Sequence, residues 1–163
     1  MENLENHYII CGYGQTGQIV VEELQRGNHP FLVIDHDPDS INLLEQRRIL
    51  YLEGDATQEE ILMKAGIQKA KGLVSALTKD AENLFVVLTA RDLNSDLTIV
   101  AKAIHHNSHN KLKRAGATNT VSPTEIGGHR IASMLIRPAV IAFLDTLTRA
   151  GEIELDLEDV VIE

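Results

Sequence analysis

The 163-residue sequence contains a single cysteine, no excess of basic residues and no long apolar run. Because Cys11 has no second cysteine to pair with and lies in an apolar segment, we expect a reducing, cytoplasmic setting. A membrane-spanning helix needs about 18 to 20 apolar residues, and the acidic start of the chain lacks the positive charge of a signal peptide. The sequence therefore predicts a soluble chain. Any membrane partner is expected on another chain or on sequence outside these 163 residues.

Charge is unevenly distributed and excludes one broad class of function. The formal net charge is −9, and six of the acids lie in residues 151–163, which contain no base. Residues 1–150 therefore carry a net charge of only −3. An acidic chain without a stripe of lysine and arginine lacks the positive surface that nucleic-acid binding requires, so we expect no nucleic-acid partner.

Short apolar segments alternate six times with helical patterns, which is typical of a doubly wound parallel α/β sheet. The predicted strands are His7–Cys11, Phe31–Asp35, Leu50–Gly54, Gly72–Leu77, Thr98–Ala103 and Thr120–Ser122. Most are apolar throughout, as expected when helices cover both faces of a sheet. Right-handed crossovers then predict a six-stranded, Rossmann-like sheet of order 3-2-1-4-5-6, with a crevice beside the first strand.

Local residues predict several helix ends. Asp37 followed by Pro38 predicts a helix start, and Thr57-Gln58-Glu59-Glu60 predicts a capping box with Thr57 as the N-cap. Gly66 and Gly116 stand where helices are expected to stop. Ser122-Pro123-Thr124 predicts a turn that opens the last helix.

The last predicted helix, about Ile126 to Leu147, is apolar on all sides and must therefore be buried on all sides. No later strand of this chain can cover it, so we expect a homodimer that exchanges this helix. The alternative is a helix packed wholly on its own sheet. Pro138 removes one backbone donor and is expected to bend the helix.

The segment Gly12-Tyr13-Gly14-Gln15-Thr16-Gly17 follows the first predicted strand and opens the amphipathic helix Gln15–Arg26. In this context the glycine pattern predicts a phosphate-binding loop. Gly12 permits the tight turn, Gly14 lets the backbone approach a pyrophosphate, and Gly17 lets the helix lie close to the strand. The free N–H groups at the helix start then face the anion.

Asp35 ends the second predicted strand, 18 residues after Gly17, and His36 adjoins it in the predicted site. An acid at this place accepts hydrogen bonds from a ribose diol and repels a 2′-phosphate, so we predict NAD rather than NADP. The alternative is an ordinary glycine-rich turn with an unrelated aspartate at a strand end.

Three further segments are placed by topology at the carboxyl ends of strands, where ligands of such sheets bind. Asp55, Ala56 and Thr57 follow the third strand, beside the expected adenine, although Asp55 could instead only cap the next turn. Thr78 follows the fourth strand. Lys102, the one base inside a predicted strand, is expected to contact a phosphate; the alternative is a lysine whose ammonium extends to solvent.

We expect structural roles, rather than metal binding or reactivity, for a cluster of three histidines and for the cysteine. His105 and His109 are spaced to share a helical face and, with His106, offer a possible metal site, but a third ligand is not visible. We therefore expect a polar loop-to-helix transition and no metal. Cys11 is expected to be a core residue, since no nearby charge would favour its thiolate.

Six segments taken together resemble the RCK domain, also called the TrkA N-terminal domain, which regulates potassium conductance. They are Tyr8–Gly17, Val33–Asp37, Gly54–Thr57, Ala65–Ile67, Arg114–Ala117 and Ser122–Pro123, in the family's order and spacing. The resemblance implies a domain over residues 1–150 that binds NAD(H), or else AMP, ADP or ATP, in the crevice. It also implies pairing through the last helices, assembly into a ring such as an octamer, and a membrane-embedded potassium channel or transporter as partner at the inner face of the membrane.

The resemblance implies further that residues 151–163 lead into a smaller C-terminal lobe that is absent. At two places the sequence departs from the family's pattern, and each departure limits which ligand the resemblance implies. Gln15 stands where some ATP-binding relatives carry arginine, which disfavours the extra charge of a triphosphate. Ala76, Lys102 and Ile104 stand in regions where calcium-gated relatives carry acids, so no calcium site is implied.

The predicted crevice contains residues suited to binding a nucleotide but no evident catalytic group. A dehydrogenase needs a substrate pocket and an acid–base group facing the nicotinamide, and the six strand–helix units use about 150 residues. We therefore predict a ligand-sensing regulatory domain that is not an enzyme. The alternative is a small or truncated NAD-dependent oxidoreductase.

Overall fold

The computed structural model describes residues 3–150, so the acidic segment 151–163 and the role expected for it lie outside the described residues. The strands are β1 (Tyr8–Cys11), β2 (Phe31–Asp35), β3 (Tyr51–Glu53), β4 (Gly72–Ser75), β5 (Thr98–Lys102) and β6 (Asn119–Val121). The helices are α1 (Gln15–Arg26), α2 (Pro38–Gln46), α3 (Glu59–Lys64), α4 (Asp80–Leu93), α5 (Ser108–Ala115), α6 (Pro123–Ile136) and α7 (Pro138–Ala150). The chain forms two compact units, one ending at Pro123 and one beginning at Thr124.

The strands of the first unit form one parallel six-stranded sheet in the order β3-β2-β1-β4-β5-β6. Ile10 of β1 is in register with Val33 of β2 and with Val74 of β4. This confirms the predicted Rossmann-like topology. The chain proceeds outward from β1 in one direction and then from β4 in the other, so the crossovers diverge between these strands and open a crevice at their carboxyl ends.

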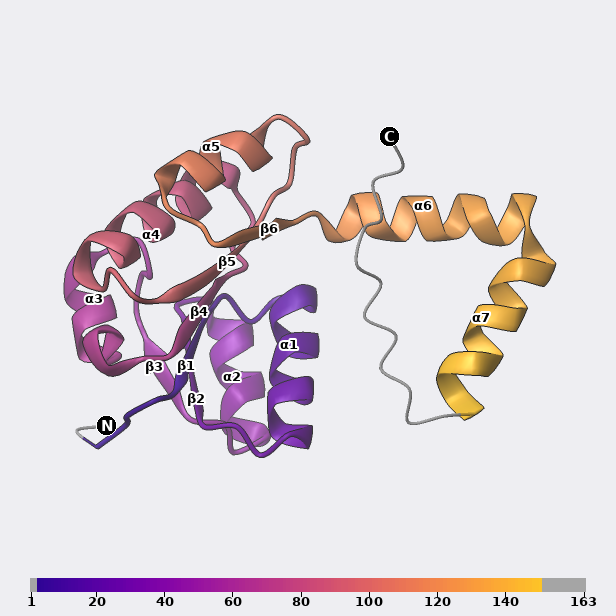
Figure 1. Cartoon of the computed structure of the whole chain (residues 1–163). Coiled ribbons are helices and arrows are strands. Elements are labelled where there is room, and N and C mark those ends of the chain that lie inside the picture. Colours follow the sequence, from indigo (N-terminus) through magenta and orange to yellow (C-terminus); the bar gives the residue numbers. More distant parts are fainter. Residues whose placement is uncertain (1–2, 151–163) are drawn as a thin grey trace. The chain divides into compact units, whose positions relative to one another are not determined.

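Helices cover both faces of this sheet, as the apolar strands predicted (Figure 1). On one face α1 and α2 pack over a core that includes Ile10, Tyr13, Val21, Val33 and Leu44. On the other face α3, α4 and α5 pack over a core that includes Ile9, Cys11, Leu62, Val87 and Leu112. Successive residues of a strand thus enter different cores, which is why β1 and β2 are apolar without alternation.

Three of the predicted helix ends are confirmed. Asp37 is the N-cap of α2, its carboxylate accepting a hydrogen bond from the Ser40 N–H at 2.9 Å, and Pro38 is the first helical residue. Gly66, just beyond α3, and Gly116, the C-cap of α5, have φ angles of +75° and +118°. These left-handed conformations favour glycine and end the helices.

The predicted capping box at Thr57 is wrong. The N-cap of α3 is Gln58, and no side chain caps this helix. Asp55 accepts hydrogen bonds from both the N–H and the hydroxyl of Thr57, at 2.9 and 2.7 Å. Because the Thr57 hydroxyl is committed to this local turn, the helix begins one residue later.

The predicted single helix from Ile126 to Leu147 is also wrong in detail, because the structure divides it into α6 and α7. The two helices are bent by 117° at Arg137. Pro138 has no N–H to bond to the preceding turn and its ring excludes the carbonyl there, so the predicted bend becomes a break. An Arg130–Asp145 ion pair joins the two helices.

Large apolar side chains remain exposed along α6 and α7. Nine of them are between 39% and 83% exposed: Ile126, Ile131, Met134, Leu135, Ile136, Val140, Phe143, Leu144 and Leu147. Within residues 3–150 no single helix is long and apolar enough to span a membrane; only the bent pair α6 and α7 together meets that length and composition.

Candidate functional site

The loop between β1 and α1 has the geometry that its glycines predict. Gly12 has φ +98°, and a Cβ added there would lie 2.7 Å from the Ala76 carbonyl oxygen. A Cβ on Gly17 would lie 2.0 Å from the Gly12 carbonyl oxygen, so α1 approaches β1 as closely as a helix without a side chain permits. A Cβ on Gly14 would meet nothing within 4 Å. Gly12 and Gly17 are therefore required by packing, whereas Gly14 borders open space.

The first turn of α1 has unused backbone donors. Gly14 is the N-cap and provides no side-chain cap, and the first turn contains no acid. The first helical hydrogen bond runs from the Gln18 N–H to the Gly14 carbonyl. No hydrogen bond within residues 3–150 engages the N–H groups of Gln15, Thr16 or Gly17, so these donors and the helix dipole are available to an anion.

Tyr13 contributes its backbone to this site and its side chain to the core. The ring is 1% exposed and lies in the core beneath α1 and α2. Its hydroxyl accepts a hydrogen bond from Arg47 at 3.1 Å. Because a fully buried aromatic side chain makes many contacts with the core, the Tyr13 ring anchors the middle of the loop 12–17 to the core.

Asp35 lies at the carboxyl end of β2, next to the loop, as predicted. One carboxylate oxygen accepts the Tyr13 N–H at 2.7 Å, and the other accepts the N–H groups of His36 and Asp37 at 2.7 and 2.8 Å. A carboxylate offers about four acceptor positions, so a ribose hydroxyl could still donate to it. Asp35 therefore joins the loop after β1 to the loop after β2.

The segment after β3 brings Asp55 close to His36. Hydrogen bonds from the Thr57 hydroxyl and N–H lower the pKa of Asp55, and the proximity of His36 lowers it further against the opposing effect of partial burial. Asp55 thus has the turn-forming role that the sequence left open. Ala56 is buried in the core, while His36 is exposed and Thr57 half-buried at the crevice edge.

Beyond β1, the ends of β4 and β5 provide Thr78 and Lys102. Thr78 is exposed and Lys102 is half-buried. Ile99 and Ala101 lie in the core beneath α4, so Lys102, one residue further along β5, projects to the face that carries α1. No hydrogen bond or ion pair within residues 3–150 engages the Lys102 ammonium.

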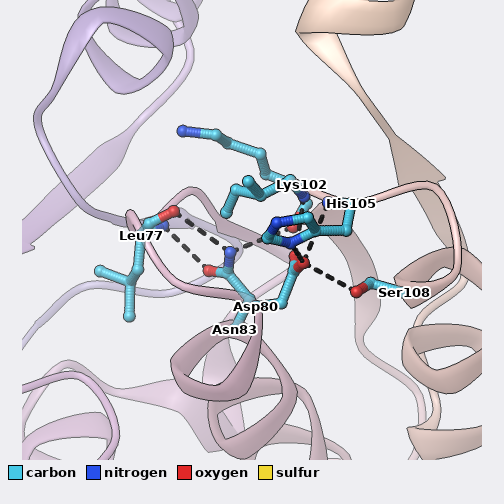
Figure 2. Close-up of polar contacts among 7 residues, drawn as sticks. Leu77, Asp80, Asn83, Lys102, His105 and Ser108 are labelled. Atoms are coloured by element: carbon cyan, nitrogen blue, oxygen red, sulfur yellow. Dashed lines mark hydrogen bonds and ion pairs between the residues drawn. The ribbon is translucent and has the colours of Figure 1, made fainter.

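Two residues of this half of the crevice were missed from the sequence: Asp80 and Asn83, in the first turn of α4 (Figure 2). Asn83 is fully buried; it accepts hydrogen bonds from the Ser75 hydroxyl and the Leu77 N–H, and donates to the carbonyls of Leu77 and Lys102. These partners are up to 19 residues away in sequence, so no local pattern indicates them.

Asp80 has four hydrogen-bond donors on one carboxylate. Ile104 N–H donates to one oxygen at 2.7 Å, and the His105 N–H, the His105 ring and the Ser108 hydroxyl contact the other at 2.7 to 3.0 Å. Desolvation raises the pKa of Asp80, but these hydrogen bonds together outweigh it and lower the pKa to about 2. Asp80 is therefore a charged group whose Oδ2 atom takes three of these four hydrogen bonds and whose Oδ1 atom takes one.

The histidine interpretation needs one correction. His105 precedes α5, which begins at Ser108, so His105 and His109 do not share a helical face. The His105 ring nitrogen Nδ1 contacts Asp80, and Nδ1 of His109 contacts the Thr120 hydroxyl at 2.8 Å. His105 and His106 thus lie in the loop before α5, and His109 lies in its first turn. Cys11 is fully buried, and burial raises the pKa of its thiol, as expected for a core residue.

A cavity away from the crevice does not offer a competing phosphate site. It has a volume of about 470 Å³ and lies beside α3, with Leu4, Leu52 and Met63 in its wall. Its two lysines, Lys64 and Lys69, each pair with a glutamate at 3.0 Å.

These features together define a nucleotide-binding domain of the Rossmann class. They are the order of the strands, the glycine loop, the unused N–H donors of α1 and the acid at the end of β2. The chain belongs to the TrkA-N domain family, whose model matches residues 8–123. This confirms the resemblance found in the sequence.

Two relatives come from Methanocaldococcus jannaschii. "Probable potassium channel protein 2" is 43% identical over 100% of this chain and 50% of its own length. "Potassium channel protein 1" is 42% identical over 93% of this chain and 46% of its own length. The chain thus spans about half the length of these relatives.

Three solved structures that resemble this chain are described as containing nucleotides. The GsuK channel bound to NAD has a TM-score of 0.71 at 25% identity, over 77% of this chain and 23% of that one. GsuK bound to ADP has a TM-score of 0.70 at 25% identity, over 77% and 33%. The Shewanella denitrificans Kef CTD in AMP-bound form has a TM-score of 0.73 at 26% identity, over 89% and 92%.

Proposed function

We propose that this chain is the ligand-sensing regulatory domain of a potassium channel or potassium transporter, and that NAD(H) or an adenine nucleotide is its ligand. The observation that carries the proposal is the uncapped first turn of α1, whose three N–H groups are unused beside a Gly14 that borders open space. The names of the potassium-channel relatives, and the NAD, ADP and AMP in the solved structures, support it.

The expected pose follows from the order of the strands. The phosphates bind at Gly14, Gln15, Thr16 and Gly17, with Gly12 and Tyr13 holding the loop behind them. The adjacent ribose donates a hydrogen bond to Asp35, and the adenine lies beside His36 and the turn formed by Asp55, Ala56 and Thr57. A ligand that continues across β1 reaches Thr78 and Lys102, at the ends of β4 and β5.

Ligand selectivity follows from two charges. The Asp35 carboxylate repels a 2′-phosphate, so NAD is favoured over NADP. Lys102 is the half-buried cation on the far side of β1, and its ammonium is available to a second phosphate or to the nicotinamide half of a dinucleotide. We therefore place NAD(H) before AMP, ADP and ATP as the expected ligand.

We propose further that the chain forms a homodimer through α6 and α7, as a building block of a ring that can be octameric. Nine exposed large apolar side chains on two helices exceed what a lone soluble unit keeps in water. A second copy would remove this apolar surface from solvent. The ring would act on the membrane part of a channel or transporter from its cytoplasmic side.

We infer that the domain senses its ligand without transforming it. Asp80, at the far half of the crevice, has a pKa of about 2, well below the near-neutral pKa that suits a general acid or base. A truncated oxidoreductase is the alternative function, and no side chain of residues 3–150 supports it in the way that the α1 donors support binding.

The direct test is a thermal-shift screen of the chain with NAD, NADH, NADP, AMP, ADP and ATP, followed by calorimetric titration. A ligand that binds only the folded state raises the unfolding temperature. We expect stabilisation by NAD(H) and by at least one adenine nucleotide, and little by NADP. No stabilisation by any of them would refute the proposal, and consumption of NADH with a second substrate would replace it by the enzyme.

A further inference from the structure

The two halves of the crevice are each tied together internally. In the first half, Asp35 links the loop after β1 to the loop after β2. In the second half, Asn83 links the turn after β4 to the end of β5, and Asp80 links α4 to the loop before α5. Figure 2 shows Leu77, Asn83, Asp80, His105 and Ser108 converging at the first turn of α4.

Between the halves, the connections are sparser. Backbone pairing of β1 with β4 crosses the boundary, including the Ala76 N–H bonded to the Cys11 carbonyl at 2.8 Å. Within residues 3–150, no side-chain hydrogen bond links the loop 12–17 to residues 77–80 or 102–105. A ligand lying across both halves would add the connection that the side chains do not make.

We propose that Asp80 and Asn83 are positioning residues for the distal part of the nucleotide, the part that extends beyond the phosphates held by α1. They fix the backbone of Lys102 and of the turn at Leu77, so that a dinucleotide meets a preformed second half of the crevice. A mononucleotide, held by the first half alone, does not depend on them. This inference rests on the proposed function and deepens it.

The contacts of Asp80 exclude a simpler role as a helix cap. Asp80 begins α4, but its partners Ile104, His105 and Ser108 are 24 to 28 residues away, and the N-cap of α4 is Lys79, which makes no side-chain cap. Its carboxylate therefore stabilises the loop after β5 rather than its own helix. All four of its hydrogen bonds go to this loop and to the start of α5, which is why we assign it a positioning role.

Asn83 and Asp80 together fix the backbone at Lys102 and immediately after it. Asn83 holds the Lys102 carbonyl at 3.0 Å, and Asp80 holds the N–H groups two and three residues later at 2.7 and 3.0 Å. The Lys102 side chain extends away from the Asp80 carboxylate (Figure 2). Its ammonium is thus free for a ligand while its backbone is fixed, which lowers the entropy lost when a ligand orders it.

The test compares NAD with AMP, by calorimetric titration of the 163-residue chain. Asp80→Asn leaves at least one of the four donors without an acceptor. We expect it to weaken NAD binding about tenfold, the scale of one lost hydrogen bond to a charged group, and to change AMP binding less than about twofold. Ser108→Ala removes one donor with little structural change, and should weaken NAD binding about threefold with AMP again unaffected.

Arg91→Met is the matched control at the other end of α4. Arg91 bonds the carbonyls of Gly116 and Ser95, far from the carboxyl ends of the strands, so its loss removes several hydrogen bonds from the same helix. We expect Arg91→Met to lower the unfolding temperature as Asp80→Asn does, but to leave the ratio of NAD to AMP affinity unchanged. Equal ratios in the two variants would overturn the positioning role.

A double-mutant cycle with Lys102→Met tests whether Asp80 acts through the lysine. If it does, Lys102→Met alone weakens NAD binding, and Asp80→Asn adds little further loss in that background. Fully additive losses would refute the inference while leaving nucleotide binding intact. Failure of the unaltered chain to bind any nucleotide of the thermal-shift screen would instead refute the proposed function, whereas binding of an adenine nucleotide without NAD would refute this inference alone.

Discussion

The Asp35 carboxylate accepts the Tyr13 N–H at 2.7 Å, so the middle of the phosphate loop is held by the residue expected to hold the ribose. The same carboxylate accepts two N–H groups of its own loop. A ligand bound there would meet a carboxylate already oriented by three donors. The position and orientation of the Asp35 carboxylate are thus fixed before binding, so less conformational entropy is lost when the ligand binds.

Asp35→Ala is expected to weaken both the fold and ligand binding. Three backbone donors lose their acceptor, which should lower the free energy of unfolding by about 2 kcal/mol, and NAD affinity should fall at least about tenfold. Urea unfolding and calorimetric titration measure the two effects. Asp37→Ala is the control: it removes the N-cap of α2 at a cost of about 1 kcal/mol, and NAD affinity should be retained. Equal affinity losses would argue against ribose recognition by Asp35.

Alanine at Gly14 and at Gly17 should separate binding from folding. The Cβ of Gly14→Ala meets no protein atom within 4 Å, so the unfolding temperature should stay within a few degrees while nucleotide affinity drops, because the methyl group occupies the approach of the phosphates. The Cβ of Gly17→Ala would lie 2.0 Å from the Gly12 carbonyl oxygen and should destabilise the fold by about 3 kcal/mol or more. Thermal unfolding with and without NAD distinguishes them; unchanged NAD affinity in Gly14→Ala would place the phosphates elsewhere.

Charged substitutions on α6 and α7 should abolish self-association. Leu135 is 83% exposed and Phe143 is 63% exposed, so Leu135→Glu with Phe143→Glu leaves the chain folded while burying a charge in any interface that uses these residues. Sedimentation velocity should show a dimer for the unaltered chain and a monomer for the variant. Ile19→Glu, at an exposed apolar position on α1, should remain dimeric. A variant that stays dimeric would place the interface on other surfaces.

Acid should reveal the contribution of Asp80. Its folded-state pKa of about 2 lies below the value of about 3.9 expected in the unfolded chain. Asp80 therefore stabilises the fold above about pH 4, and this contribution is lost as the pH falls toward 2. Urea unfolding at several pH values should show a steeper acid loss for the unaltered chain than for Asp80→Asn. Parallel profiles would mean that these hydrogen bonds do not persist in solution.

Local rules predicted much of the fold and the first half of the site. The glycine loop, the helix Gln15–Arg26 and the strand Phe31–Asp35 have the predicted bounds, because each depends on residues within a few positions. The sheet order followed from chirality, which does not depend on residue detail. The ligand contacts of the site residues remain predictions.

The errors arose where two local preferences competed or where the partners are distant. Thr57 satisfies the rule for a helix cap, but the Asp55 carboxylate two residues earlier takes its hydroxyl. Pro138 ends a helix rather than bending it. Asp80 and Asn83 bond residues up to 28 positions away, and only the finished sheet brings these together.

The sheet ends on both sides in strands of three residues, β3 and β6, and their exposed residues include Glu53 and Asn119. Short edges with polar side chains offer few backbone groups to a neighbouring chain and discourage open-ended strand addition. If copies of the domain associate as we propose, they are therefore not expected to extend the sheet, and contacts between helical surfaces can form a closed assembly of fixed size.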